Sequence, residues 1–170
     1  RIRVRIREEV CLAVVDLGTR FLVNAEGGVF KELQPDDLVD APVVTGLEVT
    51  DLGVDPGAAS PLGQAALDLL RLAAAPAAAL PLARIDRVHA DREMGLVVHL
   101  RGEPPHGRGA VVRLGLGGLG EKLQRGERVL ARWEALGGRR DFRVMDLQNP
   151  ERVIVTPAAE GSGDEQGKEV

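Results

Sequence analysis

Aromatic side chains are scarce in this sequence of 170 residues, which has three phenylalanines, one tryptophan and no tyrosine. Proteins that bind single-stranded nucleic acid stack bases on such side chains. The formal net charge of −4 also disfavours a surface that binds phosphates. Nucleic acid is therefore not an expected partner. With a hydrophobic content of 44%, the core is expected to be built from Leu, Val and Ala.

Residues that commonly carry catalysis are also few. The single cysteine, Cys11, cannot form an internal disulfide, and its apolar surroundings predict a small buried hydrophobe. The two serines, Ser60 and Ser162, are interpreted as a helix cap and a tail residue, which disfavours a serine triad. The histidines are spaced unlike metal ligands; they are His89, His99 and His106. The sequence thus predicts no catalytic residue, no metal and no cofactor, and favours a non-enzymatic binding or scaffolding module.

Long apolar runs are missing as well. The longest candidate, residues 69–82, is interrupted by Arg71, Pro76 and Pro81, so it is not expected to span a bilayer. No signal peptide is visible. The chain begins without Met inside the alternating pattern of residues 1–7, and we therefore expect it to be a fragment of a longer protein.

One motif points to a different function. Gly115, Gly117 and Gly120 form a G-x-G-x-x-G between a predicted strand and a predicted helix, and Asp146 closes the next strand. That arrangement is typical of a dinucleotide-binding turn. However, only one further strand fits after Asp146, and the strands upstream of Ala110 mostly lack crossover helices. A structural turn is the favoured interpretation, and a nucleotide-binding enzyme that uses Gly115–Gly120 remains the alternative.

The remaining patterns predict an α+β fold with an antiparallel or mixed β-sheet and two main helices on one face. Strands are predicted over residues 1–7, 10–15, 21–23, 29–30, 85–89, 96–100, 110–114, 142–147 and 152–156, with a short extended segment over 41–49 and a loop over 51–57.

The two helices are predicted from caps and apolar spacing. Ser60 and Pro61 are typical of an N-cap and a first helical residue, and apolar residues then follow at helical spacing as far as Ala73. A second helix begins after the glycines. Its apolar face is predicted to bury four side chains against the sheet: Leu119, Leu123, Leu130 and Trp133. Glu121 and Arg125 form a supportive pair four residues apart.

The order of five segments resembles the extracytoplasmic domain of the FtsQ/DivIB family of cell-division proteins. Residues 22–30 (LVNAEGGVF) and 41–48 (APVVTGLE) are similar to the family segments LVDADGVVF and LPLLTG. The hairpin of 85–100 follows. Residues 112–115 (VRLG) with 119–123 (LGEKL) resemble the strand-to-helix step of the family, and 144–147 (VMDL) with 152–155 (RVIV) resemble its ending.

This resemblance implies domain boundaries within the chain and a function. Residues 1–8 would be the end of the preceding POTRA domain, 9–157 the β-domain of the family, and 158–170 a disordered tail. Members of the family are divisome scaffolds of the bacterial inner membrane. They are held by a single membrane-spanning helix that is absent from this sequence, with the β-domain in the periplasm at the division septum. They bind FtsB-like and FtsL-like partners and help to regulate septal peptidoglycan synthesis.

The last predicted strand is the candidate partner-binding site. A final strand can leave one edge unpaired, and a strand of a partner can add there through main-chain hydrogen bonds. The residues of this candidate site are Arg152, Val153, Ile154, Val155 and Thr156.

Overall fold

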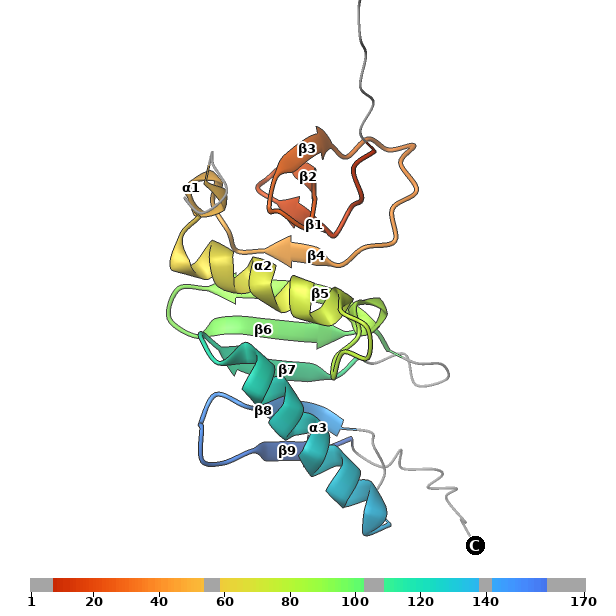
Figure 1. Ribbon diagram of the computed structural model, residues 1–170, viewed down its shortest axis with the longest axis vertical. Coiled ribbons are helices and arrows are strands. Elements are labelled where there is room, and N and C mark those ends of the chain that lie inside the picture. Colours follow the sequence, from red (N-terminus) through yellow and green to blue (C-terminus); the bar gives the residue numbers. More distant parts are fainter. Residues whose placement is uncertain (1–7, 54–58, 103–108, 138–141, 159–170) are drawn as a thin grey trace, which may run out of the picture.

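Within the part of the chain that the structure describes, the fold is one nine-stranded mixed sheet with helices packed against it (Figure 1). A computed structural model describes residues 8–53, 59–102, 109–137 and 142–158. The strands are β1 (Ala13–Asp16), β2 (Arg20–Val23), β3 (Val29–Glu32), β4 (Val43–Thr45), β5 (Ile85–Asp91), β6 (Gly95–Leu100), β7 (Val111–Gly115), β8 (Phe142–Asp146) and β9 (Ile154–Pro157). The helices are α1 (Val49–Leu52), α2 (Pro61–Ala74), the 3₁₀ turn η1 (Leu82–Arg84) and α3 (Leu119–Ala135).

The strand order is β3-β2-β1-β4-β5-β6-β7-β8-β9, so β3 and β9 are the two edges of the sheet that the described residues form. Neighbouring strands are antiparallel except at three pairings, namely β1 with β4, β4 with β5 and β7 with β8. Helical crossovers make two of these parallel pairings possible. Residues of α1 and α2 connect β4 to β5, and α3 connects β7 to β8. The two main helices, α2 and α3, lie on the same face of the sheet (Figure 1), as predicted for an α+β domain.

Helix α2 packs over β5 and β6 at the centre of the sheet. The N-cap Ser60 accepts a hydrogen bond from the N–H of Gly63 at 3.1 Å, which confirms the predicted start of the helix. Leu69 and Leu70 of α2 are buried, and they meet strand residues such as Val88 and Val98 in a single core. The core is aliphatic, as the composition predicted.

Helix α3 contacts the sheet through its first half. Leu119, Leu123 and Gly126 are buried, whereas Leu130 is only partly buried. The prediction that Trp133 is buried was wrong, since 51% of this residue is exposed. The reason is that α3 crosses β8 and the edge strand β9 obliquely and projects beyond them (Figure 1), so that its last turns have no sheet beneath them.

Several element boundaries in the structure also differ from the predicted ones. The strand predicted over residues 10–15 is β1, which starts at Ala13, and Val10 is exposed. The last strand begins at Ile154 rather than Arg152 and includes Pro157. Part of the loop predicted over 51–57 belongs to α1, whose residue Asp51 is buried. The strand predicted over 1–7 and the tail from residue 159 onward lie outside the described residues.

Candidate functional site

The edge strand β9 carries the candidate site. It pairs on one side with β8, where Met145 lies opposite Val155 and Asp146 lies opposite Ile154. Among the described residues no strand pairs with its other side. Ile154 is 45% exposed, while Val155 is half-buried and packs against the core. Arg152 and Val153 precede the strand, so the backbone that an added strand can reach is that of residues 154–157. Pro157 has no N–H, which sheets tolerate at edges.

The turn between β8 and β9 is held by Arg125 of α3. Its guanidinium donates hydrogen bonds to the carbonyl oxygens of Leu147 (3.1 Å), Asn149 (2.8 Å) and Pro150. The predicted pair of Arg125 with Glu121 is not among the ion pairs of the described residues; Arg125 reaches these carbonyls instead. The side chain of Asn149 also accepts a hydrogen bond from the N–H of Glu151 at 2.8 Å. These contacts fix where the edge strand begins.

Gly126 brings α3 close to β8. A Cβ atom added at Gly126 would lie 3.0 Å from the sulfur of Met145 and 3.1 Å from Cδ1 of Leu147. Both distances are tighter than normal packing contacts, so a glycine at this point of the helix allows the close approach. Neither Gly126 nor Arg125 was identified from the sequence as a residue that positions the candidate site.

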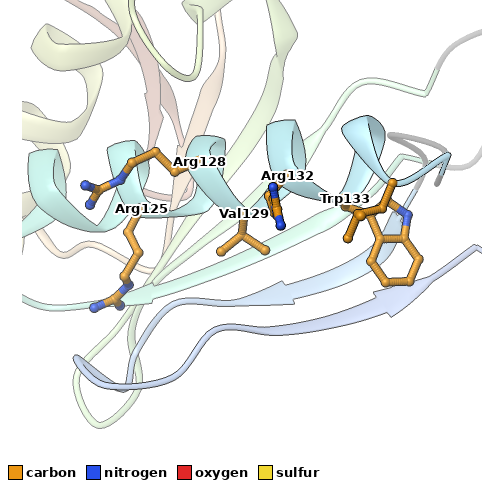
Figure 2. A pocket seen from close by; sticks show the side chains of 6 residues that line it. Arg125, Arg128, Val129, Arg132 and Trp133 are labelled. Carbon is orange, nitrogen blue, oxygen red and sulfur yellow. The ribbon is translucent and has the colours of Figure 1, made fainter.

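A groove lies along the exposed part of α3, beside the edge strand (Figure 2). Val129 and Trp133 line it, together with three arginines and Leu136. Its volume of about 410 Å³ is within the range of ligand sites, but α3 alone supplies its lining. It is therefore a surface hollow with apolar and basic walls, and it does not enclose a small molecule.

The glycine motif forms the turn between β7 and α3. Gly115 (φ +67°) lies so close to Gly95 that a Cβ on Gly95 would be 2.4 Å from the carbonyl carbon of Gly115. The ammonium of Lys122 donates to the carbonyls of Leu114 (2.7 Å) and Leu116 (3.1 Å). Burial and the nearby Arg125 lower the pKa of Lys122. The side chain of Lys122 thus stabilises the turn by binding carbonyl oxygens of the turn itself.

The surroundings of this motif differ from a dinucleotide fold. β7, α3 and β8 do form one parallel β-α-β unit, and Asp146 ends β8 as predicted. On its other side, however, β7 pairs with the antiparallel strand β6. A doubly wound parallel sheet with helices on both faces is absent from the described residues, and this is the topology that the nucleotide alternative requires.

His89, His99 and Cys11 occupy positions on or next to the sheet, whereas His106 lies outside the described residues. His89 contacts Thr45, with 3.1 Å between Nδ1 and Oγ1. Burial, followed by the charge of Arg87, lowers the pKa of His99. Cys11 is half-buried rather than buried, and burial raises the pKa of its thiol. In the part of the chain that the structure describes, no group of three His, Cys, Asp or Glu side chains is placed to hold a metal ion.

The buried carboxylate of Asp51 was also missed, because its partners come from distant segments. It accepts hydrogen bonds from the Ser60 hydroxyl at 2.6 Å and from the N–H of Glu48 at 2.8 Å, and it pairs with Arg92 at 3.2 Å. The hydrogen bond from Ser60 lowers the pKa of Asp51 most, while Glu48 and Arg92 lower it further against the opposing effect of burial. This network fixes α1 against the start of α2.

Comparison with known proteins places this fold in a family. The model of the C-terminal region of cell division protein FtsQ/DivIB matches residues 13–148, from β1 to the residues after β8. The chain belongs to the FtsQ/DivIB family. The resemblance inferred from the five sequence segments is thereby confirmed. The matched range ends at residue 148, before the candidate edge strand β9.

Relatives within the FtsQ/DivIB family include proteins named cell division protein FtsQ. The chain is 33% identical to that of Anaeromyxobacter sp. (strain K), over 98% of this chain and 54% of the relative. It is 26% identical to that of Geotalea daltonii and 32% identical to that of Myxococcus fulvus, over 52% and 56% of those proteins. The chain thus spans about half the length of these relatives. None of the described helices combines the length and apolar character needed to cross a membrane.

Proposed function

We propose that this chain is the periplasmic β-domain of a non-enzymatic divisome scaffold, which binds FtsB-like and FtsL-like partners by adding one of their strands to β9. The observation that carries this proposal is the outer side of β9, which presents backbone groups of residues 154–156 without a partner strand among the described residues. Main-chain hydrogen bonds would supply affinity, and side chains at alternate positions would supply selectivity.

The two sheet edges differ in a way that favours β9. The outer strand at the opposite edge, β3, carries Lys31 and Glu32, and Lys31 also pairs with Asp37 at 2.5 Å. Charged side chains on an edge discourage the addition of another strand. The sequence of β9 is IVTP and has no charged side chain. The edge at β9 is therefore the better acceptor for a partner strand.

Membership of the FtsQ/DivIB family supports the cellular part of the proposal. As part of this proposal, we assign residues 1–8 to the end of a POTRA domain and 9–157 to the β-domain. The relatives are about twice as long as this chain, which leaves room for a POTRA domain and a membrane-spanning helix of the inner membrane. At the septum, the scaffold would help to regulate peptidoglycan synthesis through its partners.

Proline substitutions in β9 test the proposal. Ile154→Pro and Val155→Pro each remove one backbone donor, and alternate residues direct their N–H groups to opposite sides of a strand. At least one of the two variants should lose binding in a pull-down with the periplasmic parts of the FtsB and FtsL counterparts. Circular dichroism establishes that the variant is folded.

The matched controls are Phe30→Pro and Lys31→Pro on the opposite edge strand, β3. If they fold, they should retain the partners, because the edge they alter is not the proposed site. Undiminished binding by both folded β9 variants would exclude this edge. Loss of binding in the β3 variants alone would indicate that the partner binds at the opposite edge of the sheet.

A further inference from the structure

The groove on α3 has an apolar floor and basic margins. Trp133 is 51% and Leu136 is 71% exposed, and both line the groove together with Arg132 and Arg128. Neither arginine forms an ion pair with the described residues. Glu127 and Glu134 neighbour these arginines in the sequence but are not among the residues that line the groove. The face that contains the groove is therefore positively charged and suits an acidic segment.

The chain leaves β9 close to this groove. Pro157 lies opposite Phe142 in the register of β9 and β8. Phe142 is only six residues after Leu136, at the end of α3, and six residues span at most about 22 Å. Residues 158–170 could extend over about 45 Å. The chain length is thus sufficient for these residues to reach every part of the groove.

The residues that follow β9 have the complementary charge. Between residues 159 and 170 there are four acidic side chains and one basic side chain, Lys168, which gives a charge of −4 + 1 = −3. The acidic side chains are Glu160, Asp164, Glu165 and Glu169.

We propose that residues 159–170 cover the α3 groove within the same molecule, with their carboxylates facing Arg128 and Arg132. The contact requires no regular structure in the tail. A short tether gives the tail an effective concentration on the order of 1 mM at the groove, so even a contact with a dissociation constant near that value is half occupied. The inference itself does not depend on the proposed partner.

Trp133 provides a direct test, because it is the single tryptophan of the chain. Quenching of its fluorescence by acrylamide should be compared between the full chain and a chain ending at Ala158. If the tail covers the groove half of the time, acrylamide reaches Trp133 in the full chain only during the other half. The quenching constant of the truncated chain should then be up to about twofold larger than that of the full chain. A full-length variant with Glu160→Gln, Asp164→Asn, Glu165→Gln and Glu169→Gln should behave like the truncated chain. Salt at about 0.5 M should remove the difference by screening.

Two further variants locate the contact. Replacing Arg128 and Arg132 by Ser in the full chain should raise quenching to the level of the truncated chain. Arg20→Ser removes an exposed arginine near the opposite edge of the sheet and should leave the quenching of Trp133 unchanged. Equal quenching of the full and truncated chains at low salt would overturn the proposal. The electrostatic contact would be overturned if the variant with the neutralised tail were still quenched less than the truncated chain. It would also be overturned if the full and truncated chains still differed in quenching at high salt.

Discussion

Arg125 in the middle of α3 donates a hydrogen bond to the carbonyl oxygen of Asn149, 24 residues later, at 2.8 Å. The same guanidinium binds the carbonyls of Leu147 and Pro150, so one side chain of the helix holds the turn that leads into the edge strand. We expect Arg125→Ala to destabilise the domain by about 1.5–3 kcal/mol, as for other hydrogen bonds of charged groups. Binding of the proposed partner should weaken as well. Urea denaturation and the pull-down measure the two effects.

The control for this variant is Arg128→Ala, one turn further along the same helix. Arg128 is exposed and makes no ion pair with the described residues, so its replacement should change stability by less than about 0.5 kcal/mol. If Arg125→Ala were as stable as Arg128→Ala, the contacts of Arg125 with the turn would contribute nothing to the fold.

Two glycines of α3 should respond to substitution in opposite directions. Gly126→Leu should destabilise the domain by roughly 1–3 kcal/mol, because Met145 and Leu147 leave no space for a side chain. Gly120→Ala should stabilise it by about 0.4–1 kcal/mol, since the nearest atoms to an added Cβ are 4.0 Å away and alanine restricts the unfolded chain. Midpoints of thermal unfolding test both. A stable Gly126→Leu variant would mean that α3 can move away from β8.

Local patterns in the sequence predicted much of this fold. The Ser60–Pro61 cap, the hairpin of 85–100 and the strand-to-helix step at Gly115 are all set by neighbouring residues, and all are present. The strand order was not predictable in the same way. The parallel pairings of β4 with β1 and β5 join segments separated by crossovers, and nothing in a short window specifies such partners.

In the candidate site, too, local features were predictable from the sequence and features set by distant residues were not. The edge position of the last strand could be anticipated from its place in the sequence, whereas its start at Ile154 depends on the turn that Arg125 holds. Helical spacing placed Trp133 near the apolar side of α3. It could not indicate that the sheet ends before Trp133 is reached, because periodicity describes the direction of a side chain and not the extent of its surroundings.

The exposure of Trp133 leads to a prediction about stability. Trp133→Ala should lower the free energy of unfolding by less than about 0.5 kcal/mol, as at other exposed positions. Leu123→Ala on the same helix should cost about 2–5 kcal/mol, because Leu123 is buried in the core. Circular dichroism in urea measures both without relying on tryptophan fluorescence. Similar costs for the two variants would place Trp133 in the core after all.

Acid should weaken the domain through Asp51. A carboxyl whose pKa is lowered by folding stabilises the protein above its unfolded pKa, near 3.9, and this contribution disappears as the pH falls through the lowered pKa. Asp51→Asn should therefore be less stable by about 1–3 kcal/mol at neutral pH, with a difference that narrows below about pH 4. Urea midpoints between pH 7 and pH 3 measure it. Asp36→Asn, at an exposed position, controls for the loss of one negative charge, and parallel curves for wild type and Asp51→Asn would contradict the linkage.

The glycine turn should not bind dinucleotides. Such ligands lie across a crevice between two parallel β-α-β halves, with the pyrophosphate at a helix N-terminus. Here one such unit is present, β6 occupies the other side of β7 in the antiparallel direction, and Lys122 binds the carbonyls of Leu114 and Leu116. Calorimetric titration of NAD, NADP and FAD into the purified domain should show no saturable heat, with a known dinucleotide-binding protein as the positive control. Saturable binding in the micromolar range would contradict this prediction. Its loss in Gly117→Asp, at a glycine with φ +68° in the turn, would then assign the ligand to the motif.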